Sequence, residues 1–475
     1  MSFSREARPV MSSTTALIKR LLADEPAFAS SVDFGACVAQ GKGKGPQVLI
    51  GDLSQISLMQ GLGDPALDHR IAHLAHRDDI LLVRNADPAF ETYLEVYRGI
   101  EGLTVLACDP ADTRPVAVQA RTVARLRDPL VAAARAHGGL TITSYLTTGT
   151  VWRLAQDIGS AAGCTVHVNG PAPRISDRAN DKLWFARIAR AVIGTEAVPP
   201  TMSAYGPEAA AALVLRLARS GEQVIVKVPD SAGSAGNIRL GSTLLAQQTT
   251  QSLQTLLLDR LHATGWTDRY PILVGVWDRD VVSSPSVQLW IPYAKVGPAV
   301  AQGVFEQTVL GERAAFVGAI RSGLPQTLQD RLIAQAVQIG GVLQALGYFG
   351  KCSLDAVICA RGVIHWIECN ARWSGVSIPL QVLQEIAPNH RFDGVVIVQQ
   401  MFSGLRLSTS EAVQTLDPVL YRSRAGEAPL QGAVILSPPV SAQGLVANLL
   451  VFAPGQSAAN QISHEALERL ASAAD

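Results

Sequence analysis

The sequence has few aromatic residues, no excess charge of either sign and no long apolar run. Phe, Trp and Tyr make up 5% of its 475 residues, and 40 basic residues balance 40 acidic ones. Without a basic block, nothing in the composition indicates nucleic-acid binding. No apolar run reaches the length of a membrane span, and the N-terminus lacks the apolar core of a signal peptide. We therefore expect a cytoplasmic protein with no nucleic-acid and no membrane partner.

Two kinds of motif are also missing. The six cysteines include no CxxC pair and no accompanying histidine cluster, which predicts reduced, mostly buried thiols. The phosphate-binding patterns GxGxxG and GxxxxGKS/T do not occur. The run GKGKG at residues 41–45 follows no predicted strand, which favours a flexible connector over a phosphate loop.

The length of the chain, with 48% hydrophobic residues, suggests about three domains. Residues 1–45 form an N-terminal extension with one expected helix, at 14–29. From residue 46 to 175, short apolar runs alternate with helical patterns, which predicts βαβ units and a parallel sheet covered on both faces. The expected strands are 47–53, 79–84, 102–108, 140–146 and 165–170, and the expected helices are 67–76, 88–97, 115–137 and 150–162.

Three histidines, His69, His73 and His76, recur at helical spacing in the first of these helices. This spacing would suit a metal site. The acidic and arginine residues beside the histidines are more typical of a solvated helix face, and we therefore expect a solvated face here.

A long loop of small residues follows a strand within residues 223–240. Lys227 lies in the strand, VIVKV, and adds a positive charge beside the loop. Small residues let backbone N–H groups approach phosphate oxygens closely. A plain hairpin loop is the alternative, but the segment is longer than a tight hairpin needs, and long loops are often functional lids. The residues assigned to phosphate binding are Ser231, Gly233, Ser234, Gly236 and Asn237.

The most informative stretch is residues 347–377, GYFGKCSLDAVICARGVIHWIECNARWSGVS. Residues 352–359 and 363–370 predict a β-hairpin in which Asp355 faces Glu368 across the ladder. The opposite face is expected to be an apolar core face formed by Leu354, Ala356, Ile358, Val363, Ile367 and Cys369.

Two carboxylates that meet directly across a ladder repel each other, and a hard divalent cation reverses that effect. Asn370 lies on the same face as Glu368, so Asp355, Glu368 and Asn370 are candidate Mg²⁺ ligands. Arg372, two positions further on, could meet a phosphate with its planar fork of donors. The alternative is an exposed hairpin whose polar face only contacts water, but that alternative does not explain the two opposed acids.

These residues carry a resemblance. Asp355 followed by E-x-N-x-R resembles the magnesium-binding end of ATP-grasp enzymes, and GYFGKCSLDAV with HWIECNARWSG is most similar to peptide ligases of the pheganomycin-biosynthesis type. The resemblance is specific in residues 175–405 and extends to the flanks at the level of fold only. Ser374 departs from it, because related ligases often have a glycine there.

The resemblance implies further site residues. It implies that Lys182, just before a predicted helix, contacts the nucleotide phosphates and that the loop after Lys227 is the phosphate flap. It makes residues 273–277, with Val274 and Val276, the adenine hinge, whose backbone groups would pair with the base, and it places Asp278 or Asp280 near the ribose.

We therefore predict an α/β N-terminal domain of the pre-ATP-grasp kind (46–175), an α+β ATP-grasp fold (176–404) and a small α+β C-terminal cap (405–475). The predicted function is an ATP- and Mg²⁺-dependent ligase that joins a small-molecule or peptide carboxylate to an amine through an acyl phosphate. Arg372 would stabilise charge during the transfer, and a homo-oligomer is compatible with this function. Two alternatives stay open: phosphoryl transfer to a hydroxyl on the same fold, and a non-catalytic ATP-binding regulator, against which the complete metal set argues.

Overall fold

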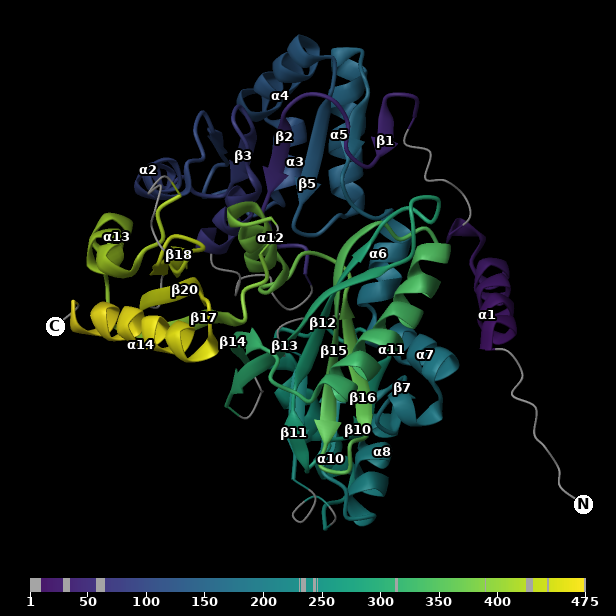
Figure 1. Ribbon diagram of the computed structural model, residues 1–475. Helices are drawn as coiled ribbons and strands as arrows, with labels where there is room; N and C mark the ends of the chain where they lie inside the picture. Colours follow the sequence, from purple (N-terminus) through teal and green to yellow (C-terminus); the bar gives the residue numbers. More distant parts are fainter. Residues whose placement is uncertain are drawn as a thin grey trace, which may run out of the picture.

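Three β-sheets organise the chain, and the helices pack around them (Figure 1). The structure is a computed structural model that describes residues 10–28, 35–56, 65–229, 231, 236–241, 245, 247–311, 315–388, 390–423, 430–441 and 444–473. No helix in these segments combines the length and the apolar character that a membrane span requires. The chain begins with α1 (Val10–Asp24) and a short 3-10 turn, η1 (Pro26–Phe28), so the helix expected at 14–29 ends earlier, just before Pro26.

The N-terminal sheet is entirely parallel, as the alternation of strands and helices predicted. Its six strands run in the order β1-β6-β5-β2-β3-β4. Val48 and Ile50 belong to one apolar core and Leu49 to another, so both faces of the sheet are covered. The elements are β1 (Val38–Gln40), β2 (Gln47–Ile50), η2 (Pro65–Leu74), β3 (Ile80–Val83), α2 (Pro88–Arg98), β4 (Thr104–Ala107), α3 (Val116–Thr122), α4 (Ala124–His137), β5 (Leu140–Ser144), α5 (Gly149–Ala162) and β6 (Val166–Val168).

The GKGKG run connects β1 to β2, as the connector interpretation predicted, but it packs closely against the sheet. It follows β1, a strand that was not predicted, and it contacts the inner strands β5 and β6. The Gly43 N–H donates to the Thr141 hydroxyl at 2.9 Å. A Cβ at Gly43 would lie 2.0 Å from the His167 ring, so this close approach requires glycine. The N-terminal domain therefore begins near residue 38 rather than 46.

A small antiparallel sheet forms the next unit, with strand order β7-β10-β8-β9. Helices α8 and α10 cover one of its faces through a core that includes Val214, Leu257 and Val274. The elements from residue 173 to this sheet are α6 (Pro173–Asn180), α7 (Lys182–Ile193), η3 (Thr195–Ala197), β7 (Thr201–Ala204), α8 (Pro207–Arg219), β8 (Val224–Lys227), β9 (Asn237–Leu240), α10 (Thr250–His262) and β10 (Ile272–Val276).

The large sheet has ten strands, and the C-terminal segment completes it. Strand β17 pairs antiparallel with β14 on one side and with β20 on the other. The predicted C-terminal cap thus has the expected mixture of strands and helices, but its strands extend the central sheet instead of forming a separate one. The elements are β11 (Val281–Ser283), β12 (Pro285–Ile291), β13 (Val300–Leu310), β14 (Ala315–Arg321), α11 (Gln326–Ala345), β15 (Gly350–Cys359), β16 (Ile364–Asn370), α12 (Ser377–Ile386), β17 (Gly394–Ser403), α13 (Thr409–Leu416), η4 (Asp417–Val419), β18 (Gly432–Ile435), β19 (Val440–Ser441), β20 (Gly444–Ala453) and α14 (Gln456–Ser472).

Two of the three histidines, His69 and His73, lie on η2, and His76 follows it. This segment lies at the junction of the N-terminal and C-terminal parts, and the expectation of a solvated face is wrong for most of it. His69 and His73 are buried, and only His76 is exposed. The His73 ring donates from Nε2 to the Ile435 carbonyl in β18 at 2.9 Å. The buried Asp68 carboxylate forms a two-bond ion pair with Arg84. These partners lie on distant segments, so helical spacing alone could not reveal them.

Candidate functional site

The β15–β16 hairpin brings the predicted metal ligands together. Asp355 pairs with Glu368, and Ser353 pairs with Asn370, in the register expected from the sequence. A β-bulge then shifts the register by one residue beyond Asp355. Beyond the bulge, Ile364 and Trp366 face the core, whereas Val363 is partly exposed and Ile367 lines a cavity. The predicted core face was therefore wrong at Val363 and Ile367.

Asp355 lies in a network of polar side chains from neighbouring strands. Its carboxylate accepts from the Ser286 hydroxyl at 2.6 Å and from the Asn370 amide at 2.9 Å. Burial and the nearby Glu368 charge raise the pKa of Asp355 to about 6, although hydrogen bonds from Ser286 and Gln307 oppose the shift. This carboxylate is thus poorly neutralised by the protein itself.

Glu368 has the opposite electrostatic environment. Burial alone would raise its pKa, but the Lys182 ammonium, 3.1 Å from the carboxylate, together with Arg372 and Lys227, lowers it. Lys182 is 5% exposed, and its ammonium also donates to the Ser231 carbonyl. Lys182 is therefore a buried cation at the centre of the site rather than an ordinary surface lysine.

The described part of the predicted phosphate loop closes against Lys182. A Cβ at Gly236 would lie 2.5 Å from the Ser231 hydroxyl, so glycine permits this close approach. Asn237 begins β9 directly opposite Lys227. Gly233 and Ser234 lie outside the described residues.

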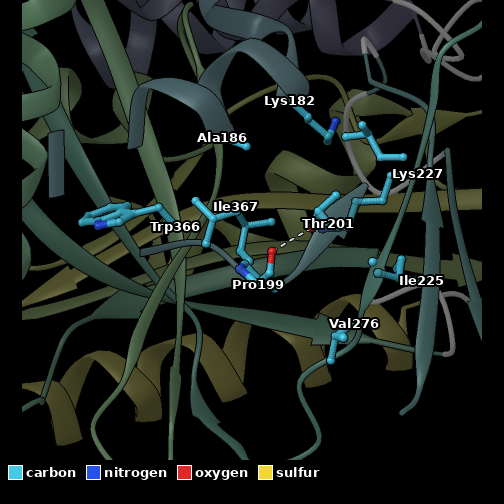
Figure 2. A pocket seen from close by; sticks show the side chains of 12 residues that line it. Lys182, Ala186, Pro199, Thr201, Ile225, Lys227, Val276, Trp366 and Ile367 are labelled. Atoms are coloured by element: carbon cyan, nitrogen blue, oxygen red, sulfur yellow. Dashed lines mark hydrogen bonds between the residues drawn. The ribbon is translucent and has the colours of Figure 1, made fainter. Parts of the chain in front are cut away.

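A narrow cavity, about 30 Å³, separates the small sheet from the hairpin. Figure 2 shows Lys182 reaching from α7 and Lys227 from β8 toward the same region. Ile367 and Val276 line the same cavity farther from the two lysines. Burial lowers the pKa of Lys227 to about 8, and the positive charge of Lys182 contributes to the shift. Apart from these two lysines, most of the residues that line this cavity are apolar.

The strand predicted as the adenine hinge, β10, contributes only part of what was expected. Leu273, Gly275 and Val276 line the cavity. The Val274 side chain is fully buried on the other face, in the core with α8 and α10, so it does not line this cavity. The Val276 N–H already donates to the Pro200 carbonyl at 2.9 Å. Asp278, two residues further on, hydrogen-bonds to His365 at 2.9 Å.

Arg372 is fixed by two amide oxygens. One Nη donates to the side chain of Asn370 at 2.6 Å, and the other donates to the side chain of Asn180 at the end of α6. The Asn180 oxygen also accepts from the Ala371 backbone N–H at 3.0 Å. The guanidinium is therefore held in one orientation by residues from two separate segments.

Arg372 and Glu368 line a second cavity of about 320 Å³ next to Lys182. The N-terminal domain closes its far side, and α6 adds charged groups to its wall. The other lining residues that matter for recognition are Gln55, Ile56, Leu146, Arg174, Asp177 and Arg178. Of the predicted site residues that the structure describes, those that line one or both of these adjoining cavities are Lys182, Lys227, Ser231, Val276, Glu368, Asn370 and Arg372. Those that line neither are Gly236, Asn237, Val274, Asp278 and Asp355.

Two contributors were not identified from the sequence: Ser286 and Asn180. Ser286 lies on strand β12, where the alternation of polar and apolar residues in PSVQLWI could have indicated a polar face. No comparable signal marks Asn180, whose role depends on the packing of α6 against the hairpin.

Two independent comparisons define the class of the fold. Residues 68–160 match the family described as Pre ATP-grasp domain. The solved structures that resemble the chain over its length are ATP-grasp enzymes, so the expected architecture, a pre-ATP-grasp domain followed by an ATP-grasp fold, is confirmed.

Three of these structures can be named. Biotin carboxylase from Campylobacter jejuni is 13% identical, with a TM-score of 0.53 over 89% of this chain and 91% of that one. The biotin carboxylase domain of the Hydrogenobacter thermophilus 2-oxoglutarate carboxylase is 14% identical, with a TM-score of 0.54 over 90% of each chain. The N5-carboxyaminoimidazole synthase from Aspergillus clavatus is 11% identical, with a TM-score of 0.53 over 90% of this chain and 99% of that one. No curated protein sequence matches the chain.

Proposed function

We propose that this protein is an ATP-dependent ligase that joins a carboxylate to the amine of an amino acid or peptide, as pheganomycin-type peptide ligases do. The observation that carries the proposal is the meeting of Asp355, Glu368 and Arg372 on one hairpin with the buried cation Lys182. Two adjoining cavities, one mostly apolar and one polar, give separate places for a nucleotide and for a carboxylate substrate. The named structural relatives were solved with ATP-site ligands, including ADP and its magnesium salt, which supports the nucleotide assignment.

The donor set fits magnesium. Asp355 and Glu368 face each other at one register position, and the raised pKa of Asp355 indicates unbalanced negative charge. Two carboxylates and the Asn370 carbonyl are hard oxygen donors of the kind that Mg²⁺ prefers. Bound there, Mg²⁺ would supply positive charge for the polyphosphate, as Lys182 and Lys227 do from the other side.

A buried cation of the N-terminal domain, Arg70, lies beside the loop that follows Arg372. Arg70 is 5% exposed and lies over the Tyr145 ring, with 5.7 Å between the guanidinium carbon and the ring centroid. Its Nη1 lies 3.8 Å from the position of a Cβ on Gly375, in the loop that follows Arg372. Among the residues that the structure describes, none accepts a hydrogen bond from Arg70 or forms an ion pair with it. A buried guanidinium without an acceptor favours an anionic ligand.

The reaction follows from these positions. A carboxylate oxygen of the substrate attacks the γ-phosphorus of ATP, and the bond to the β-phosphate oxygen breaks to release ADP. The amine nitrogen then attacks the acyl carbon, phosphate leaves with the bonding electron pair, and the amine gives up a proton. Arg372, held by Asn180 and Asn370, is placed to stabilise the charge that develops during these transfers.

A condensation screen tests the proposal. The protein is incubated with ATP, Mg²⁺ and pools of amino acids and short peptides, and products are identified by mass while phosphate is quantified. We expect a product whose mass equals the two substrates minus water, with phosphate release that requires both a carboxylate and an amine. Phosphate transfer to a hydroxyl compound would favour the alternative reaction, and nucleotide binding without any turnover would favour a regulator. The same preparation, analysed by light scattering, tests whether the ligase is a homo-oligomer.

A further inference from the structure

A second cluster of side chains that can bind a metal ion lies at the other end of the β15–β16 hairpin. The carboxylate of Asp278, the thiol of Cys359 and the imidazole of His365 each offer one atom, and these three atoms all lie within 4.8 Å of one another. The Asp280 carboxylate lies close enough to the Cys359 thiol to help raise its pKa, an effect that is due mainly to burial. We propose that Asp278, Cys359 and His365, with Asp280 beside them, form a binding site for a divalent transition-metal ion of the zinc type.

The spacing suits this class of ion. In a tetrahedral zinc site the ligands lie about 2.0–2.3 Å from the metal and therefore about 3.3–3.8 Å from each other. The three side chains are already within roughly 1 Å of that arrangement, because His365 Nδ1 and Asp278 Oδ2 are 2.9 Å apart and the largest separation stays below 4.8 Å. Small side-chain rotations would close the site.

The charges also favour a cation. Two carboxylates and a thiol gather around one imidazole, and in the described part of the chain neither Asp278 nor Asp280 forms an ion pair with a lysine or an arginine. The Asp278 and His365 side chains are only 14% and 12% exposed and Cys359 is buried, whereas Asp280 is exposed at the rim of the cluster. Water therefore screens a cation bound among the three less exposed groups only weakly.

The ligand types separate this site from the proposed magnesium site. Sulfur and imidazole nitrogen are preferred by zinc and similar ions, whereas Mg²⁺ prefers oxygen ligands. The two sites lie on the same hairpin but use different residues, so each can be occupied without the other.

The location indicates what the metal would do. Asp278 follows β10 of the small sheet, whereas Cys359 ends β15 and His365 lies on β16 of the large sheet. A metal there would fasten the small sheet to the hairpin, two residues beyond Val276 in the wall of the narrow cavity. The proposal needs neither ATP nor a substrate and does not depend on the ligase function.

Cobalt substitution tests the site directly. Full-length protein without an affinity tag is stripped with a chelator and titrated with Co²⁺, whose absorption reports thiolate ligation and tetrahedral geometry. We expect one equivalent with a thiolate-to-cobalt charge-transfer band, displaced by Zn²⁺ but not by excess Mg²⁺. Cys359→Ser should remove the band, and His365→Gln should weaken binding by about tenfold or more. Cys164→Ser is the matched control, because this partly buried cysteine lies in the N-terminal domain and should leave the titration unchanged.

Either of two results would overturn the proposal. If the wild-type protein gives no band, or if Cys359→Ser retains it at equal intensity, the cluster is a hydrogen-bonded Asp–His pair beside an ordinary buried cysteine. Thermal unfolding of every variant without metal verifies that each is folded. Zn²⁺ should raise the unfolding temperature of the wild type and of Cys164→Ser but not that of Cys359→Ser. Should Cys359→Ser fail to fold, Asp278→Asn and His365→Gln carry the same comparison.

Discussion

Asp355 and Glu368 share one register position but differ in how the protein treats their charges. Lys182 compensates Glu368, whereas Asp355 receives hydrogen bonds from neutral groups and has a raised pKa of about 6. A carboxyl whose pKa is raised on folding stabilises the fold only when protonated, and this contribution is lost as the pH rises through about 6. At neutral pH the ionised Asp355 therefore destabilises the metal-free protein.

The first prediction separates these two acids. Both Asp355→Asn and Glu368→Gln should abolish magnesium-dependent turnover, because each removes a proposed ligand. Without metal at pH 7, Asp355→Asn should raise the free energy of unfolding by about 1–3 kcal/mol. Glu368→Gln should lower it, because the buried Lys182 loses its counter-charge. Urea unfolding with magnesium chelated measures both values, and turnover that survives in either variant would refute the magnesium assignment.

The second prediction concerns Arg372. Its two Nη groups donate to two different amide oxygens, which a lysine ammonium cannot reproduce in a plane. Arg372→Lys should therefore lower kcat by about a hundredfold, or about 3 kcal/mol, while ATP affinity changes little. Asn180→Ala should lower kcat in the same direction but less, because it only orients the arginine. If Arg372→Lys weakens ATP binding and leaves kcat unchanged, the arginine anchors the ground state instead.

A third prediction follows from the lowered pKa of Lys227. Burial, with Lys182 nearby, brings this pKa to about 8, so the free protein loses one positive charge from the cavity above that pH. ATP affinity should fall by up to about tenfold per pH unit above pH 8, and Lys227→Met should flatten this dependence. Calorimetric titration between pH 7 and 9.5 measures it. An equal slope in wild type and variant would assign the titration to another group.

At the scale of single elements, the hairpin shows which features can be predicted from a sequence pattern and which cannot. The pairing of Asp355 with Glu368 was predicted correctly, but the pairs next to the turn, such as Ile358 with Ile364, lie one residue out of the predicted register. The bulge between these two regions restores the predicted register at Asp355, and it could not be predicted, because one extra residue in a strand leaves no distinct pattern. It moved Val363 and Ile367 out of the core and brought Trp366 into it.

The phosphate loop gives a prediction at the same scale. Gly236→Ala should displace Ser231, since the new Cβ would lie 2.5 Å from its hydroxyl, and with it the carbonyl that accepts from Lys182. We expect KM for ATP to rise by about tenfold, equal to about 1.4 kcal/mol, with little change in global stability. Gly241→Ala is the matched control at the far end of β9, because a Cβ there meets no atom within 4 Å. Equal KM values in the two variants would show that the Ser231 position is not important for nucleotide binding.

Across the whole molecule, the predictable features were those with local causes. The parallel sheet follows from alternating strands and helices, and five of its six strands lie within the expected ranges, whereas β1 was not predicted. The continuity of the C-terminal strands with the large sheet depends on β17 pairing with β20, about forty residues away, and no local pattern specifies that choice. The burial of η2 depends in the same way on distant partners, Arg84 and Ile435.

The buried His73 in η2 leads to a prediction about the stability of the protein at low pH. Burial, with Arg98 nearby, lowers the pKa of His73 to about 3 from an ordinary value of 6.5, so the ring stays neutral in the folded protein. Below pH 6.5 the unfolded chain binds a proton at this position that the folded chain does not bind. The free energy of unfolding should therefore fall by about 1.4 kcal/mol for each pH unit that the pH is lowered from 6 to 4, from this group alone.

The variant His73→Gln tests this expectation. It keeps a donor for the Ile435 carbonyl but cannot be protonated, so the pH dependence of its free energy of unfolding should be smaller by that slope. His76→Gln is the control, because this histidine is 68% exposed in its side chain and should leave the slope unchanged. Chemical denaturation at a series of pH values measures all three proteins, and parallel curves for wild type and His73→Gln would mean that His73 does not link the two parts of the fold to pH.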